Sequence, residues 1–345
     1  MKTSLGQIAA MGATVLSALL AAPAAHAGKT LDAIKARGQV VCGVNTSLPG
    51  FSAADESGRW TGLDVDICRA LAAAVLGDGK KVKYVPLGTH QRFTALQAGE
   101  IDVLSRNTTF SLTRDASLGL HQTAVTYYDG QGFLVPLKSK IKSIKQLKGQ
   151  PVCVQSGTTT ETNLVEYSKA NGLDLRPMVF ERVEVATRAY FAGRCAAYTT
   201  DASGLASART AEPPAVASAH AILPELISKE PLGPMVRRGD DEWFAIVRWV
   251  IYGLIEAEEH GVAQDNLDQL KSSSNPSVQR LLGVTEDTGK LLGLDRDWLV
   301  RAVRTTGNYG EIYERNVGSK SPLKIPRGLN HLWNKGGLMY AFPVR

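Results

Sequence analysis

Apolar and polar positions follow a strand–helix–strand order along the first hundred residues. Val40–Val44 is apolar and β-branched and is followed by a polar loop, which predicts a buried strand. Residues 61–76 predict a helix in which Thr61 and Asp64 have the spacing of a capping box. Its apolar stripe is formed by Leu63, Ile67, Leu71 and Val75. The remaining elements predicted in this unit are strands at 82–85 and 101–104 and a helix that begins at Phe93. This order predicts a mostly parallel sheet with helices on its faces.

A second unit of the same design follows. Its predicted elements are strands at 151–154, 178–180 and 195–199 and helices at 160–169 and 186–192. Extended segments at 127–136 and 221–236 flank this unit, and they predict two crossings between lobes. We therefore expect an α/β protein with two lobes. Lobe 1 is discontinuous (28–131 and 232–345), and lobe 2 is the inserted segment 132–231. The final third of the chain is predicted to be helical.

The first residues have the pattern of an export signal. Lys2 is followed by an uncharged apolar run, Ile8–Leu20, and then by Ala25-His26-Ala27, a small-x-small cleavage site. A membrane anchor is the alternative, but a span needs roughly 20 residues and this run is shorter. We expect a signal peptide at 1–27, a mature chain that begins near Gly28 and a periplasmic location.

Composition narrows the class of partner. Hydrophobic residues make up 44% and charged residues 21%, which is typical of a soluble globular protein. The net charge of +6 is spread along the chain, and the densest stretch, Lys138–Lys148, has the pattern of a solvated face, so no nucleic-acid partner is expected. We also expect a monomer.

The four cysteines suit an oxidising compartment. They lack metal-ligand spacing, and neither a metal nor another cofactor is expected. The layout of the two lobes favours one disulfide in each, Cys42–Cys68 and Cys153–Cys195, out of three pairings. Four buried free thiols are the alternative.

Three polar loops follow predicted strands, where open α/β sheets bind ligands. Loop 105–115 contains Arg114, which can hold a carboxylate through two hydrogen bonds or pair with Asp115 at the surface. Loop 155–161 begins a helix whose free N–H groups would attract an anion, or it is an ordinary capped helix start with Thr158 and Glu161 as the capping box.

The third loop, 200–203, contains Asp201, which can accept a hydrogen bond from an ammonium group or serve as a helix cap. Together the loops supply an anion cradle, a guanidinium and a carboxylate, the set that a zwitterionic amino acid needs. Because the loops come from both lobes, a ligand that touches all three would stabilise a closed state.

The motifs resemble a known family. Gly62-Leu63-Asp64-Val65-Asp66-Ile67, followed by Ala70-Leu71, is similar to the signature of extracellular solute-binding proteins for polar amino acids. The general L-amino-acid-binding subgroup of amino-acid ABC transporters is similar along the whole mature chain, through motifs such as 106–109, 127–133, 154–161, 228–234 and 333–337. The resemblance implies a type II periplasmic-binding fold, L-amino acids as ligands, and the membrane permease subunits of an ABC transporter as partners.

The resemblance also implies roles for individual residues. Arg114 matches the arginine that clamps the ligand α-carboxylate, and the backbone N–H groups of Thr109 and Thr159 match those that complete this clamp. Asn107 and Asp201 match the positions that accept from the α-ammonium group. Around the ligand side chain the resemblance implies an apolar Phe51, a Leu48 where many relatives have an aromatic ring, and contributions from Thr89 and Phe110.

An enzyme is the main alternative, since some dehydratases and lytic transglycosylases use this fold. The chain has no GxSxG or HExxH motif, and Gly130-x-Gly132 lacks the third glycine and helix of a dinucleotide site. We therefore expect a binding protein and not an enzyme.

Overall fold

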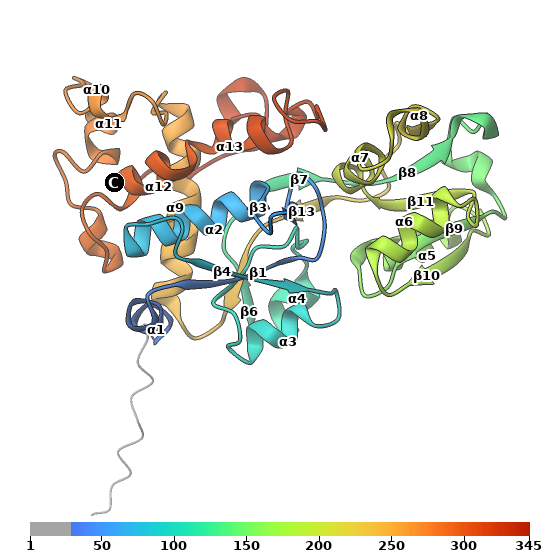
Figure 1. Ribbon diagram of the computed structural model, residues 1–345, viewed down its shortest axis with the longest axis horizontal. Helices are drawn as coiled ribbons and strands as arrows, with labels where there is room; N and C mark the ends of the chain where they lie inside the picture. Colours follow the sequence, from blue (N-terminus) through green and yellow to red (C-terminus); the bar gives the residue numbers. More distant parts are fainter. Residues whose placement is uncertain (1–28) are drawn as a thin grey trace, which may run out of the picture.

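The computed structural model describes residues 29–345, so the predicted signal peptide lies outside the described residues. The chain forms two lobes, each built on a five-stranded sheet, and a narrow connection joins them (Figure 1). Lobe 2 lies to one side as an inserted unit. Most of the C-terminal third packs on lobe 1.

The sheet of lobe 1 combines parallel and antiparallel strands. Its order is β4 (Val82–Leu87), β1 (Val40–Asn45), β5 (Val103–Leu104), β14 (Met235–Arg237) and β6 (Leu120–Gln122). Strand β1 pairs in parallel with β4 and β5, whereas β14 is antiparallel to both of its neighbours.

The sheet of lobe 2 repeats this arrangement. Its order is β10 (Arg176–Phe180), β9 (Pro151–Gln155), β11 (Ala197–Asp201), β8 (Gln131–Pro136) and β12 (His220–Ile222). Strands β10, β9 and β11 are parallel, and β8 is antiparallel to β11 and β12.

Two short strands, β7 (Tyr127–Asp129) and β13 (Glu230–Leu232), connect the lobes as an antiparallel pair. The chain enters lobe 2 through β8 and re-enters lobe 1 through β14, in both cases just after a crossing. The crossings lie at the carboxyl ends of the parallel strands. A strand that starts there must run in the opposite direction, which explains why β8 and β14 are antiparallel to their neighbours.

Helices cover both sheets. In lobe 1 they are α1 (Lys29–Arg37), α2 (Leu63–Leu76), α3 (Arg92–Gln97), α4 (Leu112–Ser117), α9 (Asp241–Glu259), α10 (Leu267–Leu270), α11 (Pro276–Leu281), α12 (Trp298–Thr306) and α13 (Tyr309–Asn316). In lobe 2 they are α5 (Thr159–Ala170), α6 (Val183–Phe191), α7 (Ala202–Thr210) and α8 (Pro214–Ala217). Minor elements are the strands β2 (Ala53–Ala54) and β3 (Trp60–Thr61) and 3-10 turns at 137–139, 144–147, 289–292, 328–330 and 333–335.

Helix α2 is at the centre of lobe 1. It is buried along almost its whole length, because the sheet covers one side and the C-terminal helices α9, α12 and α13 cover the other (Figure 1). Trp243 of α9 and Trp298 of α12 are fully buried in this core. The long C-terminal segment therefore completes the lobe 1 core around α2.

The predicted capping box of α2 is wrong. The N-cap is Gly62, with φ 133°, and a Cβ there would lie 2.0 Å from the Phe51 carbonyl oxygen. Thr61 belongs to β3 and caps nothing. The Asp64 carboxylate instead accepts from the backbone N–H of Asn107, because the first turn of α2 faces the loop after β5.

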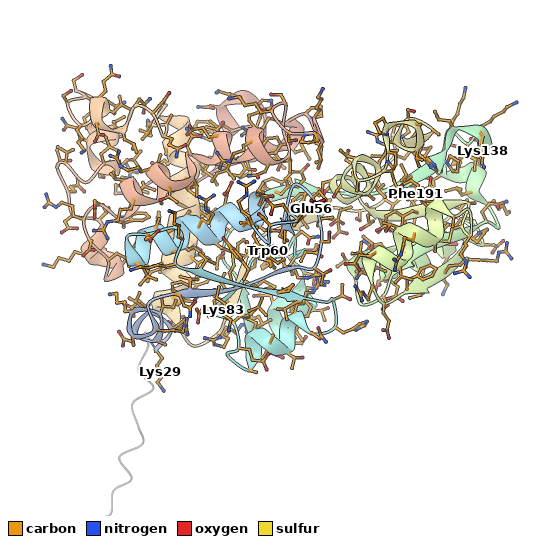
Figure 2. The ribbon with its side chains drawn as sticks, in the orientation of Figure 1. Lys29, Glu56, Trp60, Lys83, Lys138 and Phe191 are labelled. Carbon is orange, nitrogen blue, oxygen red and sulfur yellow. A yellow bond between two sulfur atoms is a disulfide. The ribbon has the colours of Figure 1, made fainter. Side chains whose placement is uncertain are left out.

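Each lobe contains one disulfide, Cys42–Cys68 in lobe 1 and Cys153–Cys195 in lobe 2. No free cysteine remains among residues 29–345. The first joins β1 to α2, and the second joins β9 to the residues just before β11. Lys138, in the basic stretch, lies at the outer end of lobe 2, far from the connection between the lobes (Figure 2). Among residues 29–345, no helix is both long and apolar enough to cross a membrane.

Candidate ligand-binding cleft

A polar cleft lies between the carboxyl ends of the parallel strands of the two lobes. It is lined by six of the candidate residues from the sequence: Thr89, Asn107, Thr109, Arg114, Thr159 and Asp201. The loops after β5, β9 and β11 all contribute, as the order of strands predicted. The other lining residues are Asn45, Arg92, Arg106, Gln155, Thr158, Thr160 and Thr200.

Arg114 lies in the short helix α4 and is buried. Its Nη1 donates to the Thr109 carbonyl oxygen at 2.8 Å, and its guanidinium lies 5.2 Å from the centre of the Phe93 ring. Burial lowers the pKa of Arg114, and the nearby Glu230 and Asp201 carboxylates oppose this. The alternative ion pair with Asp115 is not present, because Asp115 pairs with Arg238. The remaining guanidinium donors are available to an anion in the cleft.

Backbone N–H groups from both lobes complete a cradle beside this guanidinium. Among the described residues, no hydrogen-bond acceptor is found for the N–H of Thr109 or of Thr159. Thr159 is the first residue of α5, where four N–H groups have no partner within the helix. Thr158 caps the helix by accepting from Glu161 N–H, while the Glu161 carboxylate accepts from Gly157 N–H. The start of α5 is thus capped by Thr158, while the N–H group of Thr159 is available to a ligand in the cleft.

Glu230 positions this helix start. The residue is 1% exposed and lies in the crossing strand β13. Its carboxylate accepts from the Thr159 hydroxyl at 2.9 Å, from Asn163 Nδ2 at 2.8 Å and from the Ser228 hydroxyl at 2.7 Å. These three donors compensate for the burial of the Glu230 carboxylate. The network ties the interlobe connection to the start of α5.

Asn107 adopts a left-handed backbone conformation, with φ 36°. Asp64 of α2 holds it there by accepting its backbone N–H at 2.8 Å, and Asn45 Nδ2 donates to its side-chain oxygen at 3.0 Å. Burial raises the pKa of Asp64 to about 7, although the Asn107 N–H and the Ser105 hydroxyl oppose this. The Gly62–Ile67 motif therefore shapes the cleft through Asp64 without lining it.

Asp201 occupies the N-cap position of α7, yet its side chain makes no capping hydrogen bond. It is buried, and its Oδ1 atom has no hydrogen-bond partner among the described residues. Burial raises the pKa of Asp201 well above its ordinary value, and the Asp129 and Glu230 carboxylates raise it further. An unpartnered buried acceptor costs free energy that a ligand donor would recover.

The Asp129 carboxylate is one of the charged groups that act on Asp201. The Asp129 carboxylate accepts from Gly130 N–H at 2.8 Å and from Ser203 N–H at 3.3 Å. Burial raises the pKa of Asp129 to about 6. Strand pairing sets Asp129 opposite Glu230. The crossings thus carry negative charge toward the cleft, where it favours a cationic ligand group near Asp201.

Sequence reasoning missed Arg92 and Arg106. Both are buried, and Arg106 Nε donates to the Leu87 carbonyl oxygen at 2.8 Å. Arg92 Nε has no partner among the described residues, and its guanidinium lies 4.7 Å from the Phe93 ring centre. Burial and the charges of Arg106 and Arg114 hold the pKa of Arg92 well below its ordinary value. Arg106 stood within a polar loop that the sequence singled out, whereas Arg92 had no such signal.

Leu48 and Phe51 are not part of this polar cleft. Phe51 is 1% exposed in the lobe 1 core, where its ring meets Tyr127 edge-on at 5.3 Å. Leu48 is bridged to Ser52 and lines a neighbouring cavity together with Glu184 and Gly204. Phe110 is 42% exposed and also lies outside the set that lines the cleft. The resemblance implies that Leu48 and Phe51 lie next to the ligand, but neither side chain lines this cleft.

The lobes touch each other along the rim of the cleft. The Thr89 hydroxyl donates to the Ser156 carbonyl oxygen at 3.0 Å, and the His90 ring lies 2.8 Å from the Ser156 hydroxyl. The Thr46 hydroxyl donates to the Glu184 carboxylate at 2.9 Å on the other side. Direct hydrogen bonds between lobes define this arrangement as a closed one.

Residues 40–266 match the family of bacterial extracellular solute-binding proteins, family 3. The match covers more than half of the chain and includes both sheets. The chain belongs to this family. Its fold is accordingly the type II periplasmic-binding fold, with two lobes and two crossings, as expected.

Full-length relatives extend the family assignment to the C-terminal helices. The general L-amino acid-binding periplasmic protein AapJ of Rhizobium johnstonii is 57% identical over 340 residues, which is 98% of each chain. The glutamate/glutamine/aspartate/asparagine-binding protein BztA of Rhodobacter capsulatus is 50% identical over 335 residues, 97% of this chain and 98% of that one. This solute-binding protein therefore shares its long C-terminal segment with these two relatives.

A solved structure agrees in fold along nearly the whole chain. The ABC transporter periplasmic binding protein from Brucella ovis, with glutathione bound, is 53% identical. It covers 92% of this chain and 99% of its own, with a TM-score of 0.90.

Proposed function

We propose that this solute-binding protein closes its two lobes around a free L-amino acid in the periplasm and delivers it to the permease subunits of an ABC importer. The observation that carries the proposal is the pairing of chemistry in one cleft. Arg114 from lobe 1 offers guanidinium donors, and Asp201 from lobe 2 offers a buried oxygen that has no partner among residues 29–345. These groups match the α-carboxylate and the α-ammonium of one zwitterion.

Each candidate residue that lines the cleft has a role in this proposal. Arg114 and the N–H groups of Thr109 and Thr159 bind the α-carboxylate. Asp201 and Asn107 accept hydrogen bonds from the α-ammonium. Thr89 lies at the lobe contact and borders the ligand side chain.

The proposed ligand class is broad and polar. The names of AapJ and BztA describe proteins for general L-amino acids and for the acidic amino acids and their amides. The cleft of this chain is lined almost entirely by hydroxyl, amide and charged side chains, which suits polar ligands. Water can fill the room that a small ligand side chain leaves.

Closure follows from the division of the site between lobes. A ligand that binds both lobes contacts more groups in the closed state than in the open state, so its differential affinity shifts the population toward closure. The crossings β7 and β13 are the only connections through which the lobes could hinge within the described residues. We propose that the importer recognises the closed form and that the protein acts as a monomer, without a cofactor and without catalysis.

A thermal-shift screen of the mature protein over the twenty L-amino acids, with glutathione added because the Brucella ovis structure contains it, tests the proposal. Bound ligand raises the apparent stability by mass action, by about 2.7 kcal/mol at a hundredfold excess over Kd. We expect several polar amino acids to raise the melting temperature. Hits recovered chemically unchanged after incubation support a binding protein, whereas conversion of the ligand would support the dehydratase alternative. A screen without any hit would contradict the proposal.

A further inference from the structure

The C-terminal part of the chain contacts the first crossing at three consecutive residues, 126–128. The last two of them belong to β7, the strand through which the chain leaves lobe 1. Two of the contacting side chains lie on α13, and the third lies in the 3-10 turn at 328–330. We call these three side chains the hinge clasp: Tyr309, Tyr313 and Asn330.

Two members of the hinge clasp hold the residues just before the crossing. The Tyr309 hydroxyl donates to the Thr126 carbonyl oxygen at 2.8 Å. The Tyr313 ring stacks on the Tyr127 ring, with 6.0 Å between the ring centres and 6° between the ring planes. All four residues are buried, so the backbone at 126 and 127 is packed firmly against α13.

Asn330 holds Tyr128 by its backbone. The Asn330 Oδ1 atom accepts from the Tyr128 N–H at 2.7 Å, and Asn330 Nδ2 donates to the Tyr128 carbonyl oxygen at 3.1 Å. On the other side of β7, Pro231 lies opposite Tyr128 and has no N–H to donate. The buried amide of Asn330 therefore pairs with β7 as a neighbouring strand would.

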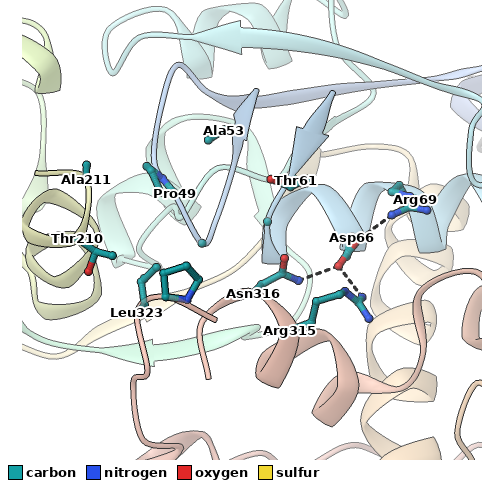
Figure 3. A pocket seen from close by; sticks show the side chains of 13 residues that line it. Pro49, Ala53, Thr61, Asp66, Arg69, Thr210, Ala211, Arg315, Asn316 and Leu323 are labelled. Carbon is teal, nitrogen blue, oxygen red and sulfur yellow. Dashed lines mark hydrogen bonds and ion pairs between the residues drawn. The ribbon is translucent and has the colours of Figure 1, made fainter. Parts of the chain in front are cut away.

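The hinge clasp is itself fixed to the core of lobe 1. Arg327 donates to the Asn330 carbonyl oxygen through Nε at 3.0 Å and Nη2 at 2.9 Å, and it pairs with Glu258 of α9 at 3.1 Å. Helix α13 is fixed to α2, because the buried Asp66 carboxylate accepts from Asn316 Nδ2 at 2.7 Å (Figure 3). The clasp and residues 126–128 therefore move with lobe 1.

Lobe 2 holds the chain from the next residue onward. The Asp129 carboxylate accepts from the Ser203 N–H at 3.3 Å, and the Gly130 carbonyl oxygen accepts from the Ala202 N–H at 2.8 Å. Both donors lie at the start of α7. The first crossing thus passes from lobe 1 to lobe 2 at Asp129.

The return crossing changes lobes at the same level. The Glu230 carboxylate is bonded to Thr159 of lobe 2 at 2.9 Å, whereas the Pro231 carbonyl oxygen accepts from the Phe110 N–H of lobe 1 at 2.8 Å. Strand pairing sets Glu230 opposite Asp129. Both crossings therefore pass between the lobes at one paired position.

We propose that the hinge clasp confines the closing motion to the Asp129–Glu230 pair, which makes Asn330 a positioning residue for ligand binding. This inference rests on the proposed function, because it concerns closure around the ligand. A hinge that also bent at Tyr128 would free that backbone in the open state, and closure would then have to order it again. The clasp avoids this entropy cost by holding Tyr128 in both states.

Calorimetry with L-glutamate on the mature protein tests this role through Asn330→Ala, which removes both hydrogen bonds to Tyr128. The matched control is Asn266→Ala. The Asn266 side chain also accepts one backbone N–H, that of Ala263 at 2.8 Å, and donates to one carbonyl oxygen, that of Gly261 at 2.9 Å. These bonds lie beside α10, away from the crossings (Figure 1).

We expect Asn330→Ala to weaken the affinity for L-glutamate about fivefold, the effect of one backbone residue that gains freedom only in the open state. Asn266→Ala should change the affinity less than twofold. Both variants lose two hydrogen bonds, so both should have a lower melting temperature than wild type. If the affinity of Asn330→Ala stays within about twofold of wild type, the role of Asn330 is purely structural and the proposal is wrong.

Hydrogen exchange of the wild-type protein gives a second test that needs no variant. Because the clasp holds in both states, the Tyr128 N–H should exchange equally slowly with and without L-glutamate. Small-angle X-ray scattering checks that the lobes open when the ligand is removed. Exchange at Tyr128 that becomes about tenfold faster without ligand would contradict the clasp and leave the proposed function standing. If wild type binds no amino acid, both proposals are wrong.

Discussion

Arg114 and Asp201 are buried charged residues from different lobes that form no salt bridge with each other or with any other residue in the described part of the chain. Burying a charge without a partner is unfavourable, so such groups mark sites where a ligand supplies the missing charge. Together, the Arg114 guanidinium and the Asp201 carboxylate therefore indicate a zwitterionic ligand more specifically than either group does alone.

Replacement of Arg114 by alanine should abolish amino-acid binding and leave the fold intact. Loss of one partner from a buried charged pair costs about 3–5 kcal/mol, which weakens the affinity more than a hundredfold. The matched control is Arg238→Ala, which removes a neighbouring surface arginine that pairs with Asp115. Calorimetry that gives near-native affinity for Arg114→Ala would refute the role of the clamp.

Binding should weaken in acid. The raised pKa values of Asp201 and of Asp129, about 6 for the latter, mean that the empty protein takes up protons as the pH falls. The ligand ammonium group needs the ionised Asp201 carboxylate. At a pH below the raised pKa of this group, ligand binding must therefore release a proton from it. The sign for the empty protein is the opposite, because carboxyls with raised pKa stabilise the fold at low pH and lose this contribution as pH rises through their folded pKa.

Calorimetry from pH 5 to 8 in buffers of different ionisation enthalpy measures this effect. Affinity should fall as the pH drops through the raised pKa of Asp201, with proton release on binding. Asp129→Asn removes one of the carboxylates that raise the pKa of Asp201 and should move the transition to lower pH. Affinity that is flat over this range in wild type would contradict the assignment.

At the residue scale, sequence reasoning found the polar cleft residues because they follow strands in hydroxyl-rich loops. It placed Leu48 and Phe51 near the ligand by analogy, whereas Phe51 packs against Tyr127 in the core. It did not single out Arg92, since a lone arginine at the start of a short helix resembles a surface residue. Only the tertiary fold shows that Arg92 is buried beside Phe93.

At the scale of elements, the order of strands and helices was predictable from hydrophobic periodicity. The antiparallel strands β8 and β14 were not, because short extended segments carry no signal of direction. Their direction depends on where the crossings enter each sheet. The start of α2 was wrong for a related reason: Thr61 and Asp64 have capping-box spacing, but tertiary contacts use Asp64 to hold Asn107.

The two disulfides should stabilise their lobes separately. They close loops with sequence separations of 26 and 42 residues, and chain entropy gives about 3.5 and about 4 kcal/mol for their loss. Denaturant unfolding of the double variants Cys42→Ala/Cys68→Ala and Cys153→Ala/Cys195→Ala measures these losses. Peptide mapping should find only these two links. A link from Cys42 to Cys153 or Cys195 would contradict the two-lobe layout.

At the scale of the whole molecule, the contacts between lobes were beyond sequence reasoning, because they join residues far apart in the chain. Gly157 illustrates this. Its φ is +69°, and a Cβ there would lie 2.8 Å from the His90 ring of the other lobe. A side chain at this position therefore requires the His90 ring to shift when the lobes close, without touching the ligand.

Gly157→Ala should weaken ligand affinity about tenfold by hindering closure. Gly149→Ala is the matched control, because Gly149 has φ +71° but open space around its Cβ position. Both variants carry similar backbone strain, so only the obstruction differs. Calorimetry should show near-native affinity for Gly149→Ala, and equal losses in both variants would contradict the role of this contact.

A crystal structure of the mature protein grown with L-glutamate tests the central claim most directly. The account predicts that the Arg114 guanidinium binds the α-carboxylate and that the Asp201 carboxylate accepts from the α-ammonium of the same molecule, with the lobes closed around it. A ligand bound elsewhere, with Arg114 and Asp201 facing away from it, would contradict the account.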